Sequence, residues 1–192
     1  MKDAFKYNEA PANDPVRIEQ VYAEKPGGGV VVEPGFDAPE TTAVGVLSSG
    51  KFGVIKGYRL IEAVAVADTT ISIEKWSGVA KNDVIAYGKK GVKCTAVNTT
   101  DANKDVVTVT MGMVIPAGTV LYQAKEASTE ASEGVEAKDA EPLYKPKYVT
   151  GNKIFAGKGD QPVRLINGAN LRKETANIGE DIAALLSNIE LV

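Results

Sequence analysis

"DVIAYGKKGVKCTAVNTTDANKDVVTVTMGMVI", residues 83–115, decides the fold class of this chain. Its apolar runs are short and rich in β-branched residues, and several of them alternate apolar with polar side chains. The breaks "GKK" and "NTTDANK" supply Gly, Asn and Asp, which tolerate positive φ or close Asx turns in tight β connections. Several strands at a spacing of about 8–12 residues predict an antiparallel sandwich or small barrel-like domain, not a parallel sheet with a cofactor crevice.

The stretch just before it, "RLIEAVAVADTTISIEKW" (59–76), predicts a hairpin with its turn at "ADTT". In an extended chain alternate side chains point to opposite faces of the sheet. One face would carry Leu60, Glu62, Val64 and Val66, the other Ile61, Ala63 and Ala65, and the returning strand would carry Ile71 and Ile73. We therefore expect a mainly β domain over residues 43–123.

An acidic stretch interrupts the β pattern at residues 124–141. It carries two lysines against six carboxylates, and Val135 is its only large apolar residue. Neither a helix nor a strand would have an apolar face to bury here, so we expect a flexible acidic spacer or loop. Residues 142–192 then resume with a β segment, in which "PVRLINGANLRKE" predicts a strand pair, and a C-terminal helix.

The first part of the chain, residues 1–42, lacks a regular period and holds five of the nine prolines. Proline withholds a backbone donor, so this region is expected to form an extended Pro/Gly-rich arm. Within it, Val16, Ile18, Val21 and Tyr22 are the candidate residues for docking on another surface. A terminus without a binding role is the alternative.

The C-terminal segment has the features of a short amphipathic helix. Asn177 is a candidate N-cap, and Glu180 stands three residues later as in a capping box. One apolar stripe is formed by Ile178, Ile182, Leu185, Leu186 and Ile189. Such a stripe has to be buried, either on the chain's own sheet or against the same element of neighbouring subunits around a symmetry axis.

The composition excludes several kinds of chemistry. The chain has no His and one Cys, Cys94, which rules out disulfides within one chain, Ser-His and Cys-His nucleophile pairs and His-rich zinc sites. Cys94 is expected to be a small buried side chain. The glycine-rich turns match no phosphate-binding motif. We therefore predict no catalytic residue, no cofactor site, no metal site and no enzymatic activity.

Charge and hydropathy limit the partners in the same way. The formal net charge is −3, whereas proteins that neutralise nucleic-acid phosphates need clustered Lys and Arg. No apolar run reaches the ~20 residues that span a bilayer, and the N-terminus lacks a secretory leader's apolar stretch. The single tryptophan, Trp76, stands at a predicted strand end, where a place in the core or at its rim is favoured over an exposed ligand-stacking role.

Several motifs follow one another in an order that is characteristic of a known protein family. The run from "GVAKNDVIAYGKKGVKC" to "AGTVLYQA" (78–124) precedes a variable Ala/Ser/Glu-rich stretch, then "PLYKPKYVTGN" (142–152) and a terminal "IAALLSNIELV". This succession resembles the head fibre proteins of tailed bacteriophages over roughly residues 50–192. Two turns differ from the family pattern, "KND" at 81–83 and "YKPKYVTGN" at 144–152.

The resemblance implies a non-enzymatic virion protein, attached to the capsid exterior and made in the bacterial cytoplasm without a signal peptide. It implies a homotrimer, a capsid protein as partner, and a tail in which a helix precedes a final hydrophobic strand. A host-surface glycan is a further expected partner. A carbohydrate-binding or adhesion module is the alternative function, although the aromatic share of 6% does not favour it.

Overall fold

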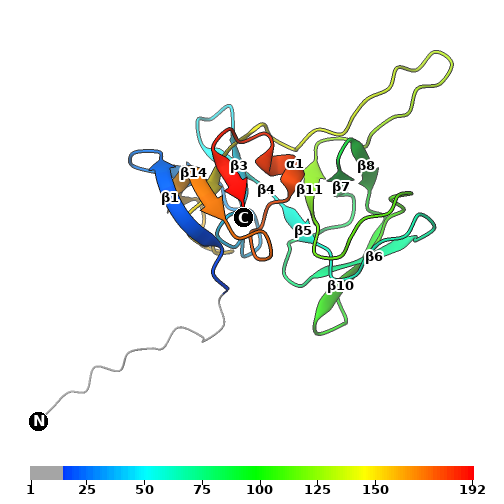
Figure 1. The fold of residues 1–192 in the computed structure, drawn as a ribbon, viewed down its shortest axis with the longest axis horizontal. Helices are drawn as coiled ribbons and strands as arrows, with labels where there is room; N and C mark the ends of the chain where they lie inside the picture. The colour runs from blue at the N-terminus through cyan, green and yellow to red at the C-terminus, as the bar shows by residue number, and fades with distance from the viewer. Residues whose placement is uncertain (1–14) are drawn as a thin grey trace, which may run out of the picture.

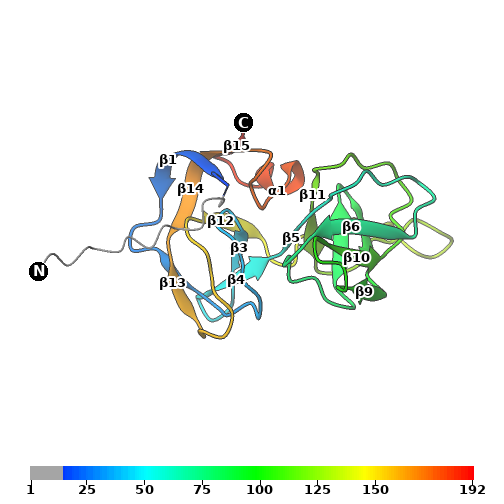
Figure 2. The same ribbon diagram turned by 90° about the horizontal axis from the view of Figure 1, so that it is seen from below.

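The computed structural model describes residues 15–192 and divides them into two lobes that lie side by side (Figures 1 and 2). These residues form fifteen strands and one four-residue helix, so the mainly β prediction is confirmed. The barrel lobe comprises residues 15–55 and 144–192. The inserted lobe comprises residues 56–143, which the chain builds between two strands of the barrel lobe.

The strands of the barrel lobe belong to one large, mostly antiparallel sheet with the order β1-β14-β12-β3-β4-β2-β13, and β15 pairs in parallel with β14. Their bounds are β1 Ile18–Glu24, β2 Gly29–Val31, β3 Ala43–Val46, β4 Phe52–Ile55, β12 Pro146–Thr150, β13 Gln161–Val163, β14 Leu165–Leu171 and β15 Ile189–Leu191. Strand β14, which pairs with β1 at one end of this order, is separated only by Arg164 from β13 at the other end. The sheet therefore curls round until its two ends meet.

Two buried clusters pack on the opposite faces of this curled sheet. Val44, Phe52 and Leu165 belong to the cluster on one face, whereas Ile55 and Ile166 belong to the cluster on the other. The alternation follows from the two-residue period of a strand. Both faces are therefore covered, one by the curled sheet itself and the other by the C-terminal segment and part of the inserted lobe.

The arm predicted for residues 1–42 is corrected by the structure from β1 onward. Residues 18–31 run antiparallel to residues 161–171, from Ile18↔Leu171 to Val31↔Gln161, across a turn that contains Gly27 and Gly28. Of the prolines that suggested an arm, Pro15 stands at the start of the described region, Pro26 stands in that turn, and Pro34 and Pro39 lie in connections. Residues 1–14, the remaining part of the predicted arm, lie outside the described residues.

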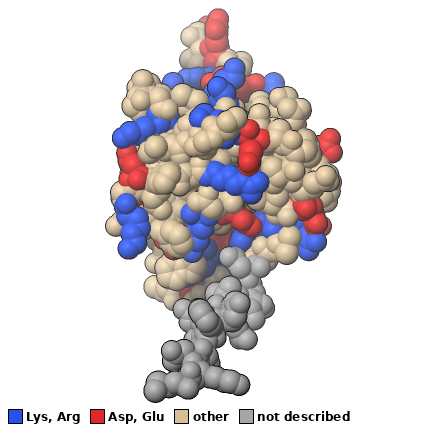
Figure 3. Space-filling view, turned by 90° about the vertical axis from the view of Figure 1, so that its left-hand side faces the viewer, with Lys and Arg blue, Asp and Glu red and all other residues tan. Residues whose placement is uncertain are grey.

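The four candidate docking residues separate into two kinds. Ile18 and Val21 pack against the core, whereas Val16 and Tyr22 are exposed. Ion pairs between Arg172 and Glu19 and between Arg164 and Glu24 also tie β1 to β14. Figure 3 shows the basic and acidic side chains interspersed over this side of the barrel lobe.

The inserted lobe is a small sandwich of two sheets around its own core. One sheet has the order β5-β11-β7-β8 and the other β6-β10-β9. The bounds are β5 Gly57–Arg59, β6 Thr70–Glu74, β7 Val84–Tyr87, β8 Lys90–Lys93, β9 Ala96–Asn98, β10 Lys104–Thr108 and β11 Val120–Ala124. Strands β7 to β10 lie within residues 83–115, but the run "GVKCTAV" (91–97) is divided between the two sheets, because β8 ends at Lys93 and β9 begins at Ala96.

The hairpin predicted for residues 59–76 is reduced to a single bridge between Leu60 and Ile73. Strand β6 pairs along its whole length with β10, and Val64 pairs with Ile115. The Asp68 carboxylate accepts a hydrogen bond from the Ala65 N–H at 2.7 Å and closes a turn before β6 begins. Leu60 and Ile73 are still buried in one core, but tertiary pairing has replaced the local hairpin.

The acidic stretch forms a protruding hairpin-like loop (Figure 1). Isolated bridges join Thr129 to Lys138 and Ser132 to Val135, and most of its side chains are exposed, as expected for a spacer. The predicted boundaries around it do change. Strands β3 and β4 belong to the barrel lobe with β12 to β14, so the domain predicted over residues 43–123 is divided between the two lobes.

The C-terminal helix is shorter than predicted and has a different cap. Helix α1 spans Glu180–Ala183 with Gly179 as its N-cap. Asn177 instead donates from its side chain to Thr42 Oγ1 at 2.9 Å and from its backbone to Thr41 Oγ1 at 2.8 Å. Asn177 therefore binds hydroxyls of residues that are distant in the sequence and does not form the predicted capping box.

The apolar stripe is buried mainly on the chain's own core. Ile178, Ile182, Leu186 and Ile189 are buried, and Ile189 begins β15 rather than continuing the helix. Leu185 is 55% exposed. Of the five residues predicted as an oligomer interface, only Leu185 remains available to a neighbour. The predicted strand pair in residues 162–174 is also absent, because β13 and β14 continue one another and pair with other strands.

Arg59 joins the two lobes. Its side chain is 9% exposed, and its guanidinium donates to the Gly118 carbonyl in the inserted lobe at 2.7 Å. The same group donates to the carbonyls of Ala176 and, at 3.3 Å, Lys173 in the barrel lobe. Burial lowers the pKa of Arg59 from its usual value, and the Glu74 carboxylate, 3.7 Å away, opposes this effect.

Replacing Arg59 by Ala should lower the free energy of unfolding by about 3 kcal/mol or more, because three carbonyls lose their buried donor. Urea denaturation measures this change. The matched control is Arg172→Ala, which removes a half-exposed ion pair with Glu19 and should cost about 0–1 kcal/mol. Equal losses for the two variants would contradict the role given to Arg59.

Candidate functional site

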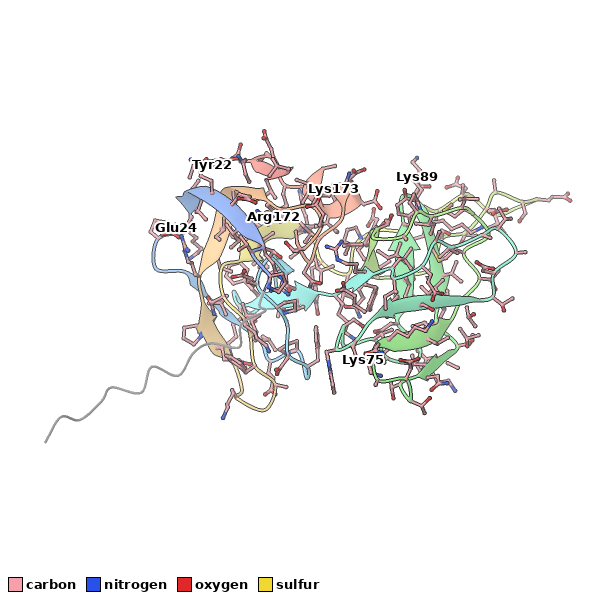
Figure 4. The ribbon with its side chains drawn as sticks, turned by 60° about the horizontal axis from the view of Figure 1, so that its bottom comes forward. Tyr22, Glu24, Lys75, Lys89, Arg172 and Lys173 are labelled. Carbon is pink, nitrogen blue, oxygen red and sulfur yellow. The ribbon has the colours of Figure 1, made fainter. Side chains whose placement is uncertain are left out.

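A cleft of about 1230 Å³ lies where the two lobes meet. The barrel lobe lines it with the connections around residues 35–40 and 151–156, and the inserted lobe lines it with β5 and the end of β6. Figure 4 labels Lys75 at this junction. We call this cavity the interlobe cleft.

Trp76 is the most unusual residue of the interlobe cleft. It follows β6, its side chain is 80% exposed, and its backbone has a φ of 64°. A non-glycine residue in this left-handed region costs about 1–2 kcal/mol. The favoured interpretation of Trp76 as a core or rim residue is therefore corrected, and a large aromatic ring is presented to solvent at a conformational cost.

Phe36 and Gly78 set the contact between the lobes beside Trp76. Gly78 has a φ of +71°, and a Cβ at this position would overlap the ring of Phe36. The Lys56 ammonium lies 5.7 Å from the centroid of the same ring. Because only a glycine allows the ring to come this close, Phe36 holds the loop that carries Trp76 in place.

The charged residues of the interlobe cleft are mostly paired. Lys75 and Asp105 are 2.7 Å apart, Lys153 and Asp37 are 3.1 Å apart, and Arg59 and Glu74 are 3.7 Å apart. The backbone N–H of Ala156 and the Lys153 ammonium lower the pKa of the Asp37 carboxyl. The cleft therefore holds paired charges of both signs.

A second, shallower surface lies on the barrel lobe. Leu185, Leu186 and Tyr148 line a groove of about 250 Å³ together with the 187–188 turn. The exposed Tyr22 reaches the same turn, because its hydroxyl donates to the Asn188 carbonyl at 3.0 Å. The structure thus brings one predicted docking residue, Tyr22, close to one predicted interface residue, Leu185. We call this surface the Tyr22–Leu185 patch.

The remaining reactive groups have ordinary structural surroundings. Cys94 is buried, its Sγ donates to the Ala96 carbonyl at 3.3 Å, and burial raises the pKa of its thiol. Between residues 15 and 192 no group of three or more His, Cys, Asp or Glu side chains is arranged to hold a metal ion. No helix within the same residues is long and apolar enough to cross a membrane.

Comparison with known proteins finds no matching family model, no matching curated protein and no matching solved structure. The function of the chain is therefore inferred from the chain's own residues.

The interlobe cleft could not be found from sequence periodicity. Its walls come from connections near residues 36, 76 and 152, which lie far apart in the chain. The one local signal is "KWSG" (75–78), where an aromatic residue stands between a strand end and a glycine. Such a residue is usually covered by the fold, and only the three-dimensional structure shows that Trp76 is exposed.

Trp76→Gly should be more stable than Trp76→Ala by about 1 kcal/mol, because only glycine relieves the left-handed backbone. At an ordinary position the order is reversed, and glycine is about 0.5–1 kcal/mol less stable than alanine. Chemical denaturation of the two variants under identical conditions gives the difference. If the alanine variant were as stable as the glycine variant, the residue would not be held at positive φ.

Proposed function

We propose that the chain is a non-enzymatic structural protein of a tailed bacteriophage virion, a head fibre or decoration protein attached to the capsid exterior. The proposal begins from the resemblance of residues 50–192 to head fibre proteins. The motifs behind that resemblance build the folded body: "AGTVLYQA" supplies β11, a central strand of its sheet, and "PLYKPKYVTGN" supplies β12.

The observation that carries the proposal is the order of elements at the C-terminus. Helix α1 is followed after a short turn by the apolar strand β15, which pairs with β14 through Ala169↔Ile189 and Leu171↔Leu191. A helix before a final hydrophobic strand is the tail that the resemblance implies. The periodicity of the sequence alone predicted one continuous apolar stripe there instead.

The surface of the barrel lobe also suits a protein partner. Its ion pairs hold acidic and basic side chains next to one another, as between Lys173 and Glu180 and between Arg172 and Glu19 (Figure 3). Interspersed charges give no single-sign field of the kind that attracts nucleic acid. Binding between two protein surfaces depends on shape and on the local pairing of charges, which such a surface allows.

The Tyr22–Leu185 patch is the surface that we assign to self-association. Tyr22 and Leu185 are both more than half exposed and flank the same turn. In a closed trimer each subunit contacts the next through two different surfaces, so the patch would pack against another surface of the neighbouring subunit. Such an assembly would cover both exposed side chains.

Co-sedimentation with capsids tests the proposed function. The capsids should be assembled from the major capsid protein encoded beside the gene of this chain. We expect the full chain to sediment with the capsids and to have, in light scattering, three times its own mass of 20.2 kDa. A chain that stays in the supernatant at every concentration would overturn the assignment to the capsid.

The oligomeric state has its own matched variants. Leu185→Asp should give a folded monomer, because an aspartate in the patch would be buried at the interface without a partner. Val66→Asp changes a residue of similar exposure, 57%, on the inserted lobe and should leave the trimer intact. A trimer that survives Leu185→Asp would show that the Tyr22–Leu185 patch is not the interface.

A further inference from the structure

We propose that the interlobe cleft binds a neutral oligosaccharide, with Trp76 as the platform on which one sugar ring stacks. The site goes beyond the proposed attachment to the capsid, and it does not depend on that attachment. Three features of the cleft support it: the presentation of Trp76, the balance of charge, and the size and fixed shape of the cavity.

Trp76 is presented as a binding residue would be. Its side chain is 80% exposed on the lining of a cleft. The backbone conformation that holds the ring there is unfavourable for any side chain, and such outliers concentrate at functional sites. The C–H face of a pyranose packs flat on an indole, while the sugar hydroxyls stay available for hydrogen bonds.

Polar groups within the same cleft suit those hydroxyls. Glu74 stands two residues before Trp76, and its carboxylate is 60% exposed. The Asp37–Lys153 pair is about half exposed on the opposite wall, so it can accept and donate hydrogen bonds at once. A carboxylate accepts from two adjacent hydroxyls, and an ammonium donates to a hydroxyl oxygen.

The charges select a neutral ligand. Three oppositely charged pairs line the cleft, namely Arg59 with Glu74, Lys75 with Asp105, and Lys153 with Asp37. Among residues 15–192, the two other charged residues that line the cleft, Arg17 and Glu40, are again one of each sign. A site for phosphate, nucleic acid or an acidic sugar would need an excess of cations, which these described residues do not supply.

The dimensions point to more than one sugar ring. Sites for single small molecules are typically about 300–1,000 Å³, and the interlobe cleft is about 1230 Å³. The cleft is also preformed, because Phe36 against Gly78 and the Arg59 contacts hold the lobes together. A preformed site loses less entropy on binding than one that has to close.

Fluorescence gives a direct test, because Trp76 is the only tryptophan of the chain. The wild-type protein is screened on an array of neutral and acidic glycans, and the neutral oligosaccharides that bind are then titrated into the protein. Stacking should shift the emission of Trp76 to shorter wavelength and quench it. The affinity from this titration should agree with calorimetry.

Single-residue variants distinguish a loss of glycan binding from a loss of folding. Trp76→Ala should weaken binding by about tenfold or more in calorimetry. Glu74→Gln should weaken it less, and Val66→Ala, which shortens an exposed apolar side chain outside the cleft, should leave it unchanged. Trp76→Ala should sediment with capsids as the wild type does, so the two proposals fail separately.

Three results would overturn the proposal that the interlobe cleft binds a neutral glycan. The first is that no neutral glycan binds the wild-type protein. The second is that only acidic glycans bind. The third is that a neutral glycan binds without any change in the emission of Trp76, or binds Trp76→Ala as tightly as it binds the wild type.

Discussion

The buried guanidinium of Arg59 is the contact on which the arrangement of the two lobes depends. It leaves β5 at the point where the chain enters the inserted lobe, and it donates to carbonyls of both lobes. Arginine suits this position because its planar group has five donors and keeps its charge when buried. A lysine carries its three donors on one nitrogen, whereas Arg59 places Nη1 against one lobe and Nη2 against the other. The fold thus places a cation where backbone acceptors from distant segments converge.

The same short segment, "KGYR" (56–59), contributes two further contacts. The Asp83 carboxylate accepts from Lys56 Nζ at 2.8 Å and from the Tyr58 hydroxyl at 3.0 Å, at the start of β7. Burial and the nearby Asp83 charge raise the pKa of Tyr58 well above its usual value. These hydrogen bonds fix the entry of the inserted lobe. The interlobe cleft is thereby a permanent feature of the fold, and Trp76 is presented from a rigid wall.

Local chemistry predicted the inserted lobe well. Strands β7 to β10 are short, their turns contain Gly, Asn and Asp, and each pairs with a near neighbour in the chain, so alternation and turn residues were sufficient. The barrel lobe depends on pairs such as Ile18↔Leu171, which no local pattern reveals. Prolines and glycines that suggested an arm instead occupy connections of a curled sheet.

The candidate sites were less predictable for the same reason. The capping box at Asn177 failed because Thr41 and Thr42, distant in the chain, offered hydroxyl partners. The apolar stripe was recognised, but only the fold shows that Leu185 points outward while Leu186 is buried. The exposure of the Trp76 side chain could not be predicted either, because it depends on how the two lobes meet.

We infer that the two lobes form one cooperative unit, joined by Arg59 and by a core cluster that contains residues of both lobes. Differential scanning calorimetry of the wild-type chain should then show a single transition whose calorimetric enthalpy equals its van't Hoff enthalpy. Two separate transitions, one for each lobe, would contradict it.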